Sequence, residues 1–104
     1  NEDFPDLILG DNDETSASSE LIKTTIDSLQ NKGYDFSHNH PFKGGYITRS
    51  FGKPAENIHA LQLEMCKTNY MDSSQTLYDE ENAERIQLVL KETLINLIEK
   101  MRFI

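Results

Sequence analysis

A run of apolar residues with helical spacing near the C-terminus constrains the fold most strongly. The apolar positions recur every three or four residues: Ile86, Val89, Leu90, Leu94, Leu97, Ile98 and Met101. Asp79 can cap the start of this helix, where Glu80 and Glu81 meet the positive end of the helix dipole. The stripe is too short for several heptads and its polar face is not basic, so it indicates a helix packed on a sheet.

The first part of the chain predicts a strand, a helix and a second strand. Residues 7–9 are continuously apolar and are followed by Gly10, which is typical of a short buried strand. Ser18 is suited to cap a helix that ends near Gly33. One side of that helix carries Ile22, Ile26 and Leu29. A second strand is predicted to start within residues 34–37.

Two further strands are predicted in the second half of the chain. Residues 46–51 are rich in β-branched and aromatic side chains and end at Gly52. Residues 54–57 predict a turn, and residues 58–66 predict another strand, although several of their side chains also favour helix. The predicted order is therefore β-α-β-β-β-α, an α/β fold with a mixed sheet flanked by helices.

Composition excludes several classes of protein. A chain of 104 residues corresponds to a single domain, and its net charge of −8 disfavours binding to nucleic acid or to anionic lipid. No apolar run approaches the roughly 18 residues that a membrane-spanning helix needs. Because Cys66 is the only cysteine, no disulfide can form within the chain, and a cytoplasmic location is expected.

The charges are unevenly distributed along the chain. Residues 1–14 contain acidic but no basic side chains, whereas residues 36–55 contain no Asp or Glu. The basic side chains and histidines of this second segment are His38, His40, Lys43, Arg49 and Lys53. The segment could bind a small anionic ligand, or its charges could pair with acidic residues elsewhere in the fold; charge alone leaves both open.

Glu64 is the candidate catalytic residue that the strand pattern singles out. In a strand over residues 58–65, alternation places Glu64 and Gln62 on one face and His59 on the other. The carboxylate either points into a cleft, where it could act as a general base, or ends the strand at solvent. His59 is equally compatible with a core histidine that is hydrogen-bonded to the backbone.

Other polar residues carry weaker signals. The guanidinium of Arg49 suits bidentate recognition of a substrate carboxylate, but it could equally form a salt bridge, for example with Glu64. His38 and His40 would share one face of a strand and could bind a metal, yet no third ligand has a recognisable spacing. Residues 11–15 begin like a calcium loop, but Ser16 stands where that loop requires glycine.

Three motifs together resemble one known family. In chain order they are Leu9-Gly10-Asp11 with Thr15-Ser16; Asn39-x-Pro41-Phe42-Lys43-Gly44-Gly45-Tyr46-Ile47-Thr48-Arg49-x-Phe51-Gly52-x-Pro54; and Ile58-His59-Ala60-Leu61-Gln62-Leu63-Glu64-Met65 followed by Tyr70-Met71. This pattern is similar to the C-terminal part of the N-formylglutamate amidohydrolase family. The two central motifs are long and stand in the expected order, and the likeness spans nearly the whole chain.

The resemblance implies a zinc-dependent hydrolase related to the zinc carboxypeptidases and aspartoacylase. Its fold would be part of a zinc-carboxypeptidase-like (phosphorylase/hydrolase-like) α/β domain. The reaction would release formate and glutamate from N-formylglutamate, or cleave a related N-acyl acidic amino acid, in histidine breakdown. By analogy Glu64 would be the general base and Arg49 would hold a substrate carboxylate. Further candidates for binding the substrate are Asn39, Lys43, Tyr46, His59 and Gln62.

The chain also departs from the family pattern. Relatives carry their metal ligands in the preceding half, and no histidine here is followed three positions later by glutamate. We therefore expect residues 1–104 to be the C-terminal segment of a larger catalytic domain, inactive without its N-terminal half. Glu14 replaces a usual glycine and His40 a frequent aspartate, which leaves the exact substrate open. The alternative is a non-catalytic α/β module that binds a small anion or a protein partner.

Overall fold

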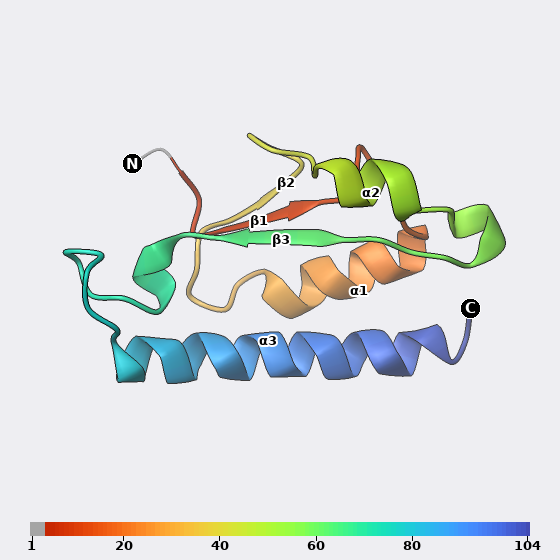
Figure 1. Ribbon diagram of the computed structural model, residues 1–104. Helices are drawn as coiled ribbons and strands as arrows, with labels where there is room; N and C mark the ends of the chain where they lie inside the picture. The colour runs from red at the N-terminus through yellow and green to blue at the C-terminus, as the bar shows by residue number, and fades with distance from the viewer. Residues whose placement is uncertain (1–3) are drawn as a thin grey trace.

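The computed structural model describes residues 4–104, which form a three-stranded mixed sheet with helices on both sides (Figure 1). The central strand β1 (Leu7–Gly10) is parallel to β2 (Phe36–His38) and antiparallel to β3 (Gln62–Met65). Register places Leu7 beside Phe36 on one side and beside Met65 on the other. The predicted α/β class with a mixed sheet is confirmed.

Two helices cover one face of the sheet. Helix α1 (Ser19–Leu29) packs on the strands, and the long helix α3 (Glu80–Met101) packs against α1 (Figure 1). The short helix α2 (Tyr46–Phe51) lies on the opposite side of the sheet. Two single turns of 3-10 helix, η1 (Pro54–Glu56) and η2 (Lys67–Asn69), flank β3 along the chain.

Both predicted helix caps are confirmed. The side chain of Ser18 accepts a hydrogen bond from the Leu21 amide, and the side chain of Asp79 accepts one from the Asn82 amide. These bonds satisfy amides that have no partner inside the helix. Helix α1 ends at Leu29, a few residues before the predicted stop at Gly33.

Only the first half of the apolar stripe of α3 is packed into the core. Leu7, Leu29 and Ile86 form the buried cluster on which α1, β1 and the first half of α3 meet. In the second half of α3, however, Leu94 and Ile98 are 61% and 60% exposed. The prediction that the whole stripe packs on the sheet is therefore wrong for these residues. Within residues 4–104, no helix combines the length and the apolarity needed to cross a membrane.

The predicted strand over residues 46–51 is wrong, because this segment is helix α2. Its first turn is stabilised by two bonds to the Gly45 carbonyl, one from the Thr48 hydroxyl (2.9 Å) and one from the Arg49 amide (3.2 Å). Thr48 is buried, so the helix has a side that packs inward. Tertiary packing has overridden the β propensity of the side chains. The predicted strand over 58–66 is confirmed only for Gln62–Met65.

A close backbone approach at the end of β1 positions the segment before α2. A Cβ added to Gly10 would lie 2.5 Å from the amide nitrogen of Gly44 and 2.7 Å from the carbonyl carbon of Lys43. The backbone at residues 43–44 therefore crosses directly over Gly10. Gly44 itself has φ +103°, a conformation that glycine adopts without strain.

We expect Gly10→Ala to lower the free energy of unfolding by about 1–3 kcal/mol, because backbone atoms must move to admit the methyl group. Chemical denaturation of the two proteins measures this difference. Gly45→Ala is the control, since the nearest atom to its added Cβ is the Gln62 side-chain oxygen at 3.6 Å, an ordinary contact. Equal losses for the two variants would show that the crossing over Gly10 is not tight.

Candidate active site

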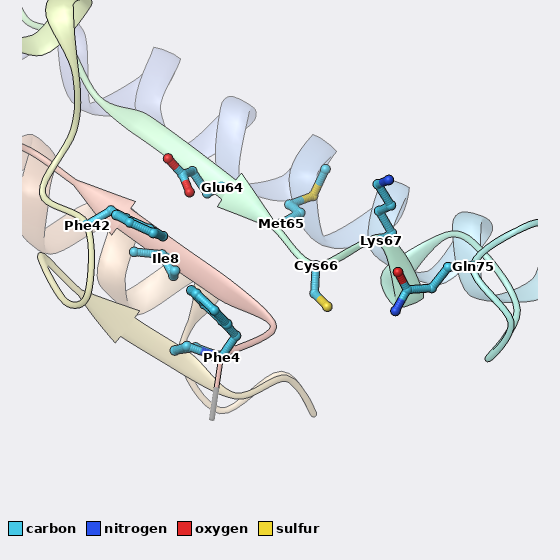
Figure 2. Close-up of a pocket in the computed structure, with 9 residues that line it drawn as sticks. Phe4, Ile8, Phe42, Glu64, Met65, Cys66, Lys67 and Gln75 are labelled. Atoms are coloured by element: carbon cyan, nitrogen blue, oxygen red, sulfur yellow. The ribbon is translucent and has the colours of Figure 1, made fainter. Parts of the chain in front are cut away.

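Glu64 lies on β3 at the wall of a pocket of about 240 Å³ (Figure 2). It is half-buried and stands beside Ile8 of β1 in the sheet register. Phe4 and Phe42 stack with their ring centroids 5.9 Å apart and form an apolar wall. The remaining lining residues are Pro5, Met65, Cys66, Lys67 and Gln75. This geometry favours the cleft interpretation of Glu64 over a strand that simply ends at solvent.

Gln62 connects Glu64 to the segment that precedes α2. Its side-chain Nε2 donates a hydrogen bond to Glu64 Oε1 over 2.9 Å. Its Oε1 accepts a bond from the Gly45 amide, also over 2.9 Å. Alternation along β3 puts Gln62 and Glu64 on the same face of the sheet, as the sequence predicts. The carboxylate is therefore held by a fixed neighbour.

The structure does not bring Arg49 or Tyr46 into this pocket. Arg49 lies in the last turn of α2, is exposed, and forms no ion pair with any acidic side chain of the described chain. The suggested salt bridge between Arg49 and Glu64 is thus absent within residues 4–104. Tyr46 is 69% exposed and packs edge-on against Phe51. Arg49 remains available to an anionic ligand at the surface.

Lys43 and His59 make contacts within the chain. The Lys43 ammonium pairs with Asp13 over 2.9 Å, and both side chains are more than half exposed. The His59 ring accepts a bond from the Ser18 amide at Nδ1 and contacts the Asn57 side chain at Nε2. His59 therefore fits the alternative of a backbone-bonded structural histidine. The structure thus supports the alternative in which Lys43 pairs with an acidic residue elsewhere in the fold.

A second polar cluster, which the sequence did not predict, lies at the carboxyl ends of β1 and β2. Asp11 is fully buried, and its carboxylate accepts bonds from the Glu14 amide (2.7 Å) and the Asn39 side-chain amide (2.7 Å). The same carboxylate contacts His38 Nε2. The Asp11 amide in turn donates to the Asn39 side-chain oxygen over 3.0 Å.

The strand pattern contained the signal for this cluster. Asp11 directly follows β1, and His38 ends β2. Adjacent parallel strands end at the same edge of a sheet, so residues at their carboxyl ends lie close together. The structure turns His38 toward Asp11, whereas His40 lies beyond the strand and is exposed. It therefore gives no support to a metal site built on these two histidines.

Residues 4–104 contain no group of three or more His, Cys, Asp or Glu side chains placed to hold a metal ion. Asp11 and His38 form a pair, and the Asp11 carboxylate already accepts bonds from the Glu14 amide and the Asn39 side chain. A zinc ion with three protein ligands does not fit the residues described here.

Cys66 follows β3 and lines the same pocket as Glu64. Hydrogen bonds from the Thr68 hydroxyl and then from the Thr68 backbone amide lower the pKa of the Cys66 thiol from its usual value. Since the thiolate is the reactive form, Cys66 is a position at which a thiol reagent would report on access to this pocket.

Comparisons with known proteins agree on one family. The family model for N-formylglutamate amidohydrolase matches residues 1–71. An N-formylglutamate deformylase of Pseudomonas putida is 46% identical over 63 residues, which cover 60% of this chain and 24% of that protein. An N-formylglutamate deformylase of Pseudomonas aeruginosa is 35% identical over 97 residues, which cover 91% of this chain and 36% of that protein.

A solved structure shows the same arrangement of elements. The N-formylglutamate amidohydrolase from Ralstonia eutropha JMP134 superposes with a TM-score of 0.77 at 31% identity, covering 95% of this chain and 35% of that one. The chain thus spans between a quarter and about a third of the length of these relatives. The agreement of family model, sequence and structure shows that the chain belongs to the N-formylglutamate amidohydrolase family.

Proposed function

We propose that this chain is part of an amidohydrolase that cleaves N-formylglutamate, or a related N-acyl acidic amino acid, into formate and glutamate. The observation that carries the proposal is Glu64, a half-buried carboxylate on the wall of a pocket and oriented by Gln62. Both residues lie within the segment that matches the family model. Family membership supports N-acyl acidic amino acids as the class of substrate, and Glu64 in the pocket is the proposed general base.

In this proposal Glu64 moves the proton that hydrolysis requires. Its carboxylate takes a proton from the attacking water as the water oxygen bonds to the formyl carbon. The same proton then passes to the glutamate nitrogen as the carbon–nitrogen bond breaks, so that a neutral amine leaves. The resemblance implies a zinc ion as well, and we propose that residues outside this chain bind it, because residues 4–104 offer no ligand set.

The proposal gives Arg49 the role of binding a substrate carboxylate. A charge-assisted hydrogen bond is worth about 1.5–3 kcal/mol, so Arg49→Ala should raise KM about 10- to 100-fold with a smaller effect on kcat. Formate release at varied substrate concentration measures both constants. Lys53→Ala, which removes an exposed cation a few residues away, is the control. A KM that is the same in Arg49→Ala and in the unmodified protein would refute the role.

We further propose that the chain works within a longer zinc-carboxypeptidase-like (phosphorylase/hydrolase-like) catalytic domain. The support is an apolar groove of about 250 Å³ under the edge strand β3, lined among others by Leu61, Leu63, Leu90 and Leu97. Leu94, which is 61% exposed, lines the same groove from the second half of α3. Exposed apolar surface of this kind is typical of an interface, and the preceding half of the domain is the occupant that we propose.

The native gene product provides the test. An antibody raised against this chain would identify and purify the protein from its source cells, where its mass and its formate release from N-formylglutamate are measured. We expect a mass more than twice that of this chain, together with formate release that chelators abolish. A protein of the mass of this chain that releases no formate would overturn the proposal and leave a binding module.

A further inference from the structure

We propose that Gln62 is a positioning residue that holds the Glu64 carboxylate in its catalytic orientation and couples it to the helix that carries Arg49. The proposal rests on the proposed function, in which Glu64 is the general base. Gln62 would act through Glu64 and not on the substrate itself.

The orientation of the Gln62 amide follows from its neighbours. The Gly45 backbone nitrogen can only donate, so the side-chain atom that faces it must be the Gln62 oxygen. The other end of the amide is therefore Nε2, which must face Glu64 and donate to it. A side chain held at both ends has little freedom to rotate, and its bond to a carboxylate is of the stronger, charge-assisted kind.

The local backbone explains why Gln62 can reach Gly45. Gln62 is paired with Gly10 in the sheet, and Gly10 has no side chain. The backbone at residues 43–44 crosses over Gly10 at a distance that a Cβ would not tolerate. The crossing brings Gly45 to the Gln62 side chain. The absence of a side chain at Gly10 is therefore what allows these two parts of the chain to approach closely.

The contacts continue from Gly45 into α2. The Gly45 carbonyl accepts a bond from the Arg49 amide, and this bond closes the first turn of the helix. One path of hydrogen bonds thus runs from Glu64 through Gln62 and Gly45 to the residue proposed to bind the substrate carboxylate. This path fixes the backbone of Arg49 relative to the base, which limits how far apart the two can move when water and substrate are aligned.

Two substitutions in the native gene product separate positioning from a purely structural role. Gln62→Met removes both bonds at similar length. Gln62→Glu keeps an oxygen for the Gly45 amide but cannot donate to Glu64 when both carboxylates are ionised. Gln87→Met is the matched control, because Gln87 is exposed on α3 and does not line the pocket of Glu64. Formate release gives kcat and KM for each protein, and thermal unfolding shows that each is folded.

We expect kcat to fall about 10- to 100-fold in both Gln62 variants, because each loses the hydrogen bond to the charged Glu64 carboxylate. KM should change less than about threefold. Gln87→Met should retain the kcat of the unmodified protein. If Gln62 only anchors the loop before α2, Gln62→Glu will keep full kcat, and the inference is overturned. An inactive unmodified protein overturns the proposed function and this inference together, whereas an active protein with unchanged Gln62 variants overturns the inference alone.

Discussion

Replacing Glu64 with Gln is expected to lower kcat for formate release by about two to four orders of magnitude, the usual contribution of a positioned general base. Glutamine has nearly the same size, and its side-chain oxygen can still accept the bond from Gln62 Nε2. The pocket should therefore keep its shape, while the group that accepts a proton from water is lost. The measurement is steady-state formate release by the native gene product with N-formylglutamate as substrate.

Glu56→Gln is the control for this experiment. Glu56 lies in η1, is exposed, and does not line the pocket of Glu64. We expect its kcat to equal that of the unmodified protein. A Glu64→Gln enzyme with a normal rate would remove Glu64 from the mechanism, because an amide cannot act as a general base at neutral pH.

The largest expected effect on stability is that of Asp11→Ala. Asp11 is 0% exposed, and its carboxylate accepts bonds from the Glu14 amide, the Asn39 side chain and His38. The substitution leaves these donors without a partner in a site that water reaches poorly. Each buried donor that loses its partner costs about 1–3 kcal/mol, a large share of the about 5–15 kcal/mol that stabilises a typical domain. Urea denaturation of the native gene product measures the loss.

Asp13→Ala is the matched control, two residues along the same loop. The Asp13 carboxylate pairs with Lys43, and both side chains are more than half exposed. Exposed ion pairs contribute about 0–1 kcal/mol, so this variant should unfold at nearly the same urea concentration as the unmodified protein. If Asp11→Ala also loses less than about 1 kcal/mol, the buried cluster at the ends of β1 and β2 is not a stabilising feature.

Local sequence determined the helices α1 and α3, the strand β1 and the family of this protein. The caps at Ser18 and Asp79 each act on the amide three residues away, and the apolar spacing of both helices is a property of nearby residues in the sequence. The continuous apolar run of β1 predicts a strand buried on both faces, as observed. Alternation alone places Glu64 and Gln62 on one face of a strand, and the structure agrees.

Only the tertiary structure decided the conformation of residues 46–51 and the partners of the polar side chains. The β-branched residues of that segment became helix α2 because it packs through Thr48 beside a backbone crossing at Gly10. His59 bonds to Ser18, and Asp11 meets His38, across 41 and 27 positions of sequence. Buried polar groups need hydrogen-bond partners. Here those partners come from distant segments that packing brings together, which local propensity does not encode.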